Sequence, residues 1–268
     1  MITRYTDANY RQLVPRDYQG VLPRRTRYNA DDSFELGLLP IEYSSLDVLD
    51  YSDLKEAITA AREAQAMPVF FQKDTWAPDG FKSSQDGLSF CWNWSACATF
   101  LDLRAIEGKE TILVAPSSLG ELTSWRDRGF YLGETASYLK KYGVAPISSV
   151  DGDFNSTNLN PNSFSDPEWK TTRLDYRLAE ILDVDCRNGD KWTVQQIVTL
   201  LCASIPCYFA INAFQHAMQL TGVSWDESAY LNVKWDVRNS HGETSTITTE
   251  GSRWIADEVI GFASSRLA

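Results

Sequence analysis

The chain is 268 residues long, with 43% hydrophobic and 12% aromatic residues and a formal net charge of -11. This composition can bury one large core or two modest lobes, which excludes a wholly disordered chain. The acidic balance argues against a nucleic-acid partner, because neutralising phosphates needs clustered Lys and Arg. The chain from Met1 shows no apolar signal-peptide region and no run near the ~18 apolar residues of a membrane span. We therefore expect no signal-peptide secretion and no membrane partner.

The five cysteines are odd in number and lack the paired spacing of zinc sites or of a disulfide framework. Free thiols in a reducing compartment are the expectation that follows, with no metal. No glycine-rich loop joins a strand to a helix in the way that a nucleotide site requires. The sequence thus predicts no cofactor.

Residues 1–50 are rich in Pro, Arg, Asp and Tyr and show no sustained period. The first 30 residues hold six arginines against two aspartates. We predict an irregular N-terminal arm that lies over the acidic body or on an acidic neighbour, with a solvated tail as the alternative.

The first two helices are predicted over residues 53–66 and 91–107. Asp53 and Glu56 have the spacing of a capping box at the start of the first helix. The second helix, Cys91–Glu107, repeats large apolar residues three or four apart, and Gly108 marks its end. This pattern predicts burial of one broad helix face.

Two further helices are predicted downstream, over residues 134–142 and from Thr193 to about 204. Gly143 closes the former, and Thr193 with Gln196 forms a capping box for the latter. Between them, residues 151–168 consist mainly of turn formers, which favours a crossing between two lobes.

The apolar period changes to two in the last third of the chain, which is typical of strands. A helical half followed by an antiparallel half predicts an α+β fold. The expected strands are Cys207–Ile211, His216–Val223, Tyr230–Arg238 and Glu243–Thr249.

Cys91 is the candidate nucleophile, because a cysteine at a helix N-terminus can be held as a thiolate below its usual pKa of roughly 8.5. His216 lies in an apolar strand that would fix its ring, and Asn239 at the end of a neighbouring strand would set the tautomer. Gln85 and the Cys91 N–H would stabilise an oxyanion. Taken singly, each residue also fits an ordinary structural role, as a core group or a turn.

Four segments resemble the papain family of cysteine peptidases. Residues 85–96 are similar to its Gln-Gly-x-Cys-Gly-Ser-Cys-Trp-Ala-Phe-Ser-Ala segment at Gln85, Cys91, Trp92, Ser95 and Ala96. His216-Ala217 with Gly222 resembles the family's histidine strand, and residues 237–242 resemble Ile-Lys-Asn-Ser-Trp-Gly. Gly133, Ala136, Tyr138 and Gly143-Val144 resemble the helix beside the substrate cleft.

This resemblance implies a papain-like two-lobe α+β fold over residues 68–268, after an N-terminal arm and helix over 1–67. A helical left lobe would span about 85–150, and an antiparallel, β-barrel-like right lobe about 165–268. It further implies a cysteine-type peptidase or amide hydrolase acting on a peptide or protein substrate. Cys91, His216, Asn239 and Gln85 would be catalytic, and Gly133 and Trp92 would bind substrate.

Several departures from the family pattern bear on activity. Leu88 replaces the family's first cysteine, which removes a disulfide, and Phe90 introduces bulk just before the nucleophile. His241 stands where the family has a tryptophan that shields the Asn-His bond. Residues 1–67 lack the helical pattern of an inhibitory propeptide.

These departures keep other functions open. The main alternative is a weak or inactive papain-like fold that serves as a structural or interaction protein of a larger assembly such as a viral particle, with contacts through the arm. A cell-wall amidase or endopeptidase with the same Cys-His chemistry is a third possibility. The expected location is accordingly cytoplasmic or virion-associated.

Overall fold

The computed structural model describes residues 3–5, 37–41, 44–71, 89–110, 112–122, 129–149, 167–186, 190–211, 214–239, 247–249 and 256–265. The helices are α2 (Leu54–Glu63), α4 (Cys91–Ile106), α5 (Ser117–Leu122), α6 (Leu132–Tyr142), α7 (Pro167–Thr172) and α8 (Asp190–Cys202). The strands are β1 (Thr3–Tyr5), β2 (Leu39–Pro40), β3 (Leu178–Asp183), β4 (Cys207–Ile211), β5 (His216–Trp225), β6 (Val233–Arg238), β7 (Ile247–Thr249) and β8 (Glu258–Ser265). Single 3-10 turns are η3 (Tyr51–Asp53), η4 (Pro68–Phe70), η5 (Ile147–Ser149), η7 (Arg173–Asp175) and η8 (Tyr230–Asn232).

The described strands form one eight-stranded sheet in the order β1-β7-β6-β5-β4-β8-β3-β2. Its six inner strands pair with one another in antiparallel order. The two outer strands, β1 and β2, come from the N-terminal arm and pair in parallel with β7 and β3. The arm therefore contributes regular structure at both sheet edges, whereas the sequence predicted an irregular segment. Its residues 6–36 and 42–43 lie outside the described chain.

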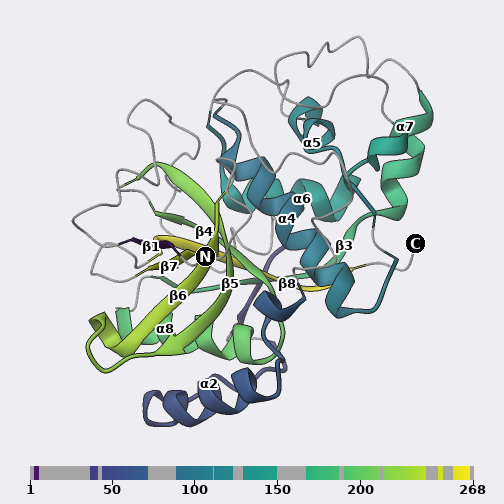
Figure 1. Cartoon of the computed structure of the whole chain (residues 1–268). Helices are drawn as coiled ribbons and strands as arrows, with labels where there is room; N and C mark the ends of the chain where they lie inside the picture. The colour runs from purple at the N-terminus through teal and green to yellow at the C-terminus, as the bar shows by residue number, and fades with distance from the viewer. Residues whose placement is uncertain are drawn as a thin grey trace.

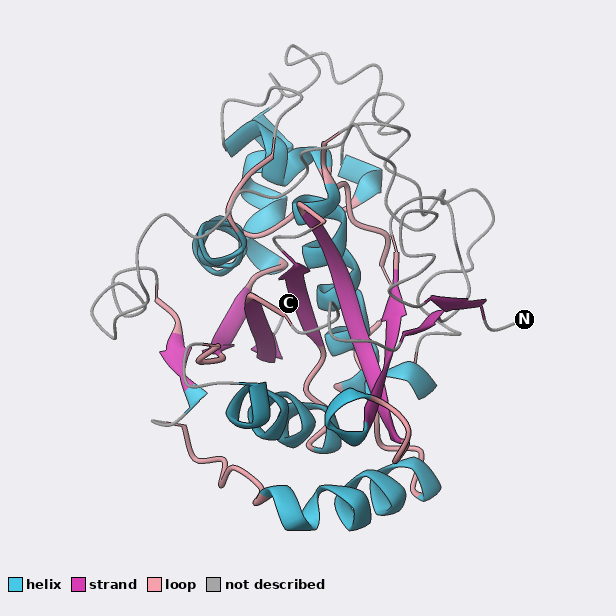
Figure 2. Cartoon of the chain, turned by 90° about the vertical axis from the view of Figure 1, so that its left-hand side faces the viewer, coloured by secondary structure: helices cyan, strands magenta, loops and turns pink. Residues whose placement is uncertain are grey.

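Helices cover both faces of this sheet (Figures 1 and 2). On one face, α4 packs against β5 and β8, and α6 packs against α4 and β3. On the other face, α8 and α2 pack against each other and against β5. Each face buries its own apolar cluster. The α+β arrangement expected from the sequence is confirmed.

The α4 helix is the central helix of its layer. Every residue from Cys91 to Arg104 is buried, so the prediction of a single buried face was wrong. The reason is that α5 and α6 cover the side of α4 that faces away from the sheet. Gly108 has φ +65 just past the helix, and it ends the helix as expected.

The two capping boxes are absent. Asp53 has helical backbone angles because η3 runs directly into α2, and its side chain makes no cap hydrogen bond. The α8 helix begins at Asp190, which places Thr193 and Gln196 inside it. Both of these side chains bond the backbone of Asp185 instead.

Most other elements lie where the sequence predicts them. The α6 helix starts two residues early and ends before Gly143, where φ is +75 and an added Cβ would lie 1.9 Å from the Arg173 oxygen. The strand Cys207–Ile211 is confirmed, and the strand from His216 extends to Trp225. Residues 230–232 form η8 rather than the start of β6. The predicted crossing between lobes lies outside the described chain up to residue 166.

Besides the two strands of the arm, the described helices and strands that the sequence did not predict are α5, α7, β3 and β8. In the described ranges, no helix combines the length and the apolar character that a membrane crossing requires.

Candidate active site

The Cys91 thiol lies at the junction of α4 and β5. Cys91 is the first residue of α4, and the N–H of Ala217 donates a hydrogen bond to its Sγ at 3.2 Å. This N–H belongs to the peptide bond that directly follows His216. The structure thus places the sulfur beside the peptide bond that joins His216 to Ala217.

His216 is oriented by Asn239. The ring Nε2 lies 2.7 Å from the side-chain oxygen of Asn239, in a buried contact between β5 and the end of β6. An amide oxygen only accepts hydrogen bonds, so Nε2 carries the proton in this pair. In the neutral ring, Nδ1 is then the nitrogen that can accept a proton from another group.

Burial dominates the electrostatics of the thiol. Cys91, His216 and Asn239 are 0%, 1% and 3% exposed. Burial raises the pKa of the Cys91 thiol to about 12, and the backbone N–H groups of Ala217, Trp92 and Cys91 oppose this rise only in part. Without a neighbouring positive charge, the sulfur would therefore remain a neutral thiol at pH 7.

A second contact between α4 and β5 fixes the sulfur in place. Ser95 lies one turn after Cys91, and its hydroxyl donates to the Ala217 carbonyl at 3.0 Å. Ala217 is thus held through both its N–H and its C=O by side chains of one helix. Ser95 matches the family pattern, and its position one turn from Cys91 was the available signal for this role.

Trp92 belongs to a buried aromatic cluster. Its ring lies 5.7 Å from Phe90 and 5.1 Å from Phe130, and its Nε1 donates to the Ser89 carbonyl at 3.1 Å. Only 1% of Trp92 is exposed. The described contacts of Trp92 are therefore ring packing within this cluster and one hydrogen bond to the backbone.

The other predicted site residues lie differently. Gly133 is buried in the first turn of α6, where its N–H donates to the Glu258 carboxylate at 3.1 Å. Glu258, at the start of β8, was not singled out from the sequence, which gave no signal for this contact. Gln85 lies outside the described residues, as do Leu88 and His241.

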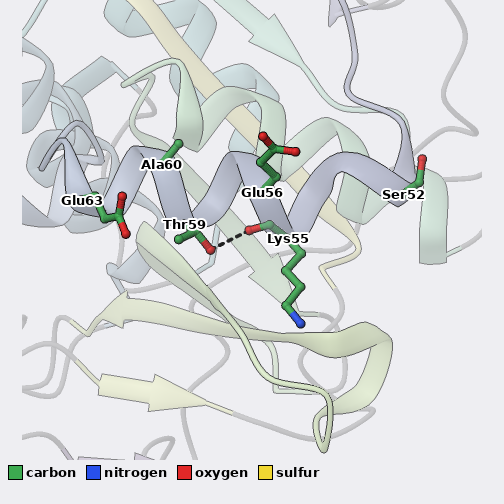
Figure 3. A pocket seen from close by; sticks show the side chains of 6 residues that line it. All are labelled: Ser52, Lys55, Glu56, Thr59, Ala60 and Glu63. Atoms are coloured by element: carbon green, nitrogen blue, oxygen red, sulfur yellow. Dashed lines mark hydrogen bonds between the residues drawn. The ribbon is translucent and has the colours of Figure 1, made fainter.

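One surface depression lies on α2, away from the residues discussed above. Ser52, Lys55, Glu56, Thr59, Ala60 and Glu63 line it (Figure 3). These exposed residues, all polar except Ala60, line an open hollow and include none of the candidate residues. Within the described ranges, no group of three or more His, Cys, Asp or Glu side chains is arranged to hold a metal ion.

The described architecture is that of the papain-like cysteine proteases. Xylellain, a cysteine protease from Xylella fastidiosa, is similar with a TM-score of 0.53 and 15% identity, over 85% of this chain and 96% of that one. Procathepsin B S9 from Trypanosoma congolense has a TM-score of 0.53 and 11% identity, over 92% and 87%. Digestive procathepsin L 3 of the Tenebrio molitor larval midgut has a TM-score of 0.52 and 12% identity, over 88% and 86%.

These likenesses concern the fold. No family profile matches the sequence, and no curated protein matches it in sequence.

Proposed function

We propose that the chain is a cysteine-type hydrolase of peptide bonds or related amides. Cys91 would be the nucleophile, His216 the general base and acid, and Asn239 the residue that orients His216. Two contacts support this proposal most strongly. The backbone N of Ala217 lies 3.2 Å from the Cys91 Sγ, and Nε2 of the preceding residue, His216, lies 2.7 Å from the side-chain oxygen of Asn239.

The chemistry begins with proton transfer from the Cys91 thiol to Nδ1 of His216. The resulting imidazolium supplies the positive charge that burial of the sulfur otherwise demands. The Ala217 N–H, already bonded to the sulfur, stabilises the thiolate further. Asn239 keeps the Nε2 proton in place throughout.

The thiolate then attacks the carbonyl carbon of the substrate amide. The negative charge on the carbonyl oxygen is stabilised by the Cys91 N–H and the side chain of Gln85. The imidazolium of His216 protonates the leaving amine as the C–N bond breaks. Water, deprotonated by the same histidine, hydrolyses the thioester and regenerates the thiol.

Trp92 and Gly133 would lie on the substrate side of the site, and the present contacts of each residue limit how it could act. The Gly133 N–H donates to Glu258, so an extended peptide would have to replace this carboxylate. Trp92 is buried, so it would act by supporting the wall formed with Phe90 and Phe130.

A non-enzymatic role in a larger assembly is the second candidate, because all three candidate side chains are almost fully buried. We further propose a disulfide-free protein in a cytoplasmic or virion-associated setting, which agrees with free thiols at all five cysteines. Assembly contacts would involve the N-terminal arm, which supplies two sheet strands.

Alkylation with iodoacetamide across pH, localised by mass spectrometry, tests the proposal. Fast modification of Cys91 near pH ~5 that is lost in His216→Ala would support an ion pair. Cys202 is the internal control, because burial raises its pKa to about 11 and it should react only at high pH. A Cys91 rate that follows the Cys202 rate would favour the non-enzymatic role.

A peptidyl epoxide provides a separate test of access to the sulfur. Covalent addition at Cys91 in the native protein would support a binding cleft for an extended peptide. Alkylation by the small reagent without trapping by the epoxide would indicate a reactive thiol that peptides cannot reach.

A further inference from the structure

Asp102 is a fully buried carboxylic acid on the helix that carries Cys91. Its exposed fraction is 0%. The two residues are eleven positions apart, which places them within roughly 20° of each other around the helix and ~16 Å apart along it. Asp102 therefore faces the same layer as the candidate nucleophile, about three turns further on.

This carboxylate is bonded to the strand that carries His216. The side-chain amide of Gln219 in β5 donates to Oδ2 of Asp102. Gln219 is also the cross-strand partner of Arg238 in β6. A buried contact thus links α4 to β5 at the position where β5 pairs with Arg238 of β6.

Arg238 provides a buried positive charge beside this contact. Burial lowers the pKa of its guanidinium to about 10, and the negative charge of Asp102 counteracts the effect. Arg238 is consequently protonated at neutral pH, and its positive charge favours the ionised form of Asp102. Removing one partner would leave the other charge buried without its counter-charge, which is strongly unfavourable.

The cluster and the candidate site use the same three elements. Asp102 shares α4 with Cys91, Gln219 follows His216 by three residues in β5, and Arg238 directly precedes Asn239. A shift of any one element against the others would change the cluster and the site together. Apolar residues would pack these elements at lower desolvation cost, but they would specify the register less sharply.

We infer that Asp102, Gln219 and Arg238 form a positioning unit that holds α4, β5 and β6 in the register at which Cys91, His216 and Asn239 meet. This inference rests on the proposed function. The unit acts through the Asn239–His216 bond and the position of the sulfur, and it does not contact the substrate. A misplacement of about 1 Å at such a site can cost about 100-fold in rate.

Kinetics of charge-removing variants test the unit. Asp102→Asn and Arg238→Met should lower kcat by about 10- to 100-fold with KM within about twofold, because the ground-state contacts to the substrate remain. Arg238→Lys, which keeps the charge, should recover most of the rate. All rates are compared per folded molecule, with the folded fraction taken from urea unfolding.

The matched control is Asp226→Asn. Asp226 pairs with Lys234, which lies in β6 like Arg238 but at the opposite end of the strand. Its loss should leave kcat within about twofold of wild type, since the pair does not adjoin Asn239. Equal effects of Asp102→Asn and Asp226→Asn on kcat would overturn the inference.

A spectroscopic measurement separates this inference from the proposed function. The chain has two histidines, so the imidazole proton signal of His216 can be assigned with a His241→Gln variant. Asp102→Asn should shift or broaden the Nε2 proton signal, and Asp226→Asn should not. An unchanged signal overturns the inference, whereas a shifted signal in a protein without turnover supports the unit and contradicts the hydrolase.

Discussion

The helices α4 and α8 lie on opposite faces of the sheet and bury different chemistry. The polar side chains buried on α8 bond nearby backbone: Gln196 bonds the N–H and C=O of Asp185, and Thr199 accepts from the Leu49 N–H at 3.0 Å. Buried α4 presents a thiol and a carboxylate to β5. The buried polar side chains of α8 thus have a structural role in holding nearby backbone. The thiol and the carboxylate buried on α4 are groups that a hydrophobic core does not need.

The largest contrast between the faces is expected for two cysteines. Cys91→Ala should lower kcat/KM by about 10⁵-fold or more, because the nucleophile of the proposed reaction is lost. Cys202→Ala on α8 should leave it unchanged. Steady-state kinetics with a peptide substrate measures kcat/KM of both variants. Substantial turnover in Cys91→Ala would contradict the role of Cys91 as the nucleophile.

A core truncation on α8 should affect stability and spare the chemistry. Leu200 is fully buried, so Leu200→Ala should lower the free energy of unfolding by about 2–5 kcal/mol. Urea unfolding measures the loss, and Leu200→Met serves as the volume-conserving control. Per folded molecule, kcat should stay at the wild-type value. A fall in kcat comparable to that of Asp102→Asn would show that packing on the α8 face also controls the candidate site.

Removing one buried hydroxyl group from each helix compares the two faces of the sheet again. Ser95→Ala should cost about 1 kcal/mol of stability, because the bond to the Ala217 carbonyl is lost. It should also lower kcat several-fold by loosening the Ala217 N–H against the sulfur. Thr199→Val on α8 should cost comparable stability without the kinetic effect, and identical kinetics in the two variants would contradict the assignment.

The smallest expected effect is a loss of stability at alkaline pH. The folded-state pKa of Cys202 is about 11, above its ordinary value of 9.0, so the unfolded chain releases this proton first. Stability from this group is present below pH 9.0 and is lost as the pH rises toward 11. Cys202→Ala should therefore flatten the decline in urea midpoint over this range.

Cys91→Ala should leave the alkaline decline unchanged if His216 keeps the thiolate charged in the folded state. A flattened decline in this variant would instead indicate a neutral buried thiol with a pKa near 12. The two cysteine variants together thus decide which state the sulfur occupies.

The fold was predictable where local patterns agree with tertiary contacts. The apolar spacing of α4 and the alternation of Val233, Trp235 and Val237 in β6 marked these elements correctly. Local rules failed at the capping boxes, where η3 and the backbone of Asp185 imposed other partners. The strand β8 was missed because its residues are buried on both faces and show little alternation.

The site was predictable only in part. Motif context singled out Cys91, His216 and Asn239 as candidates, and their proximity depends on strand register, which a single sequence does not reveal. The bond between Gly133 and Glu258 joins residues 125 positions apart, so no local signal points to it. Asp102 was recognisable only as a charge inside an apolar helix, which marks an unusual position without naming its partner.

The N-terminal strands also affect how the two edges of the sheet could pair with another chain. β1 and β2 occupy the outermost positions of the sheet and are only three and two residues long. Short border strands are poor templates for pairing with another chain, whereas the β3 and β7 backbones behind them would otherwise offer open hydrogen-bonding groups. Loss of the first 50 residues is therefore expected to expose these backbone groups and to favour self-association through β3 and β7.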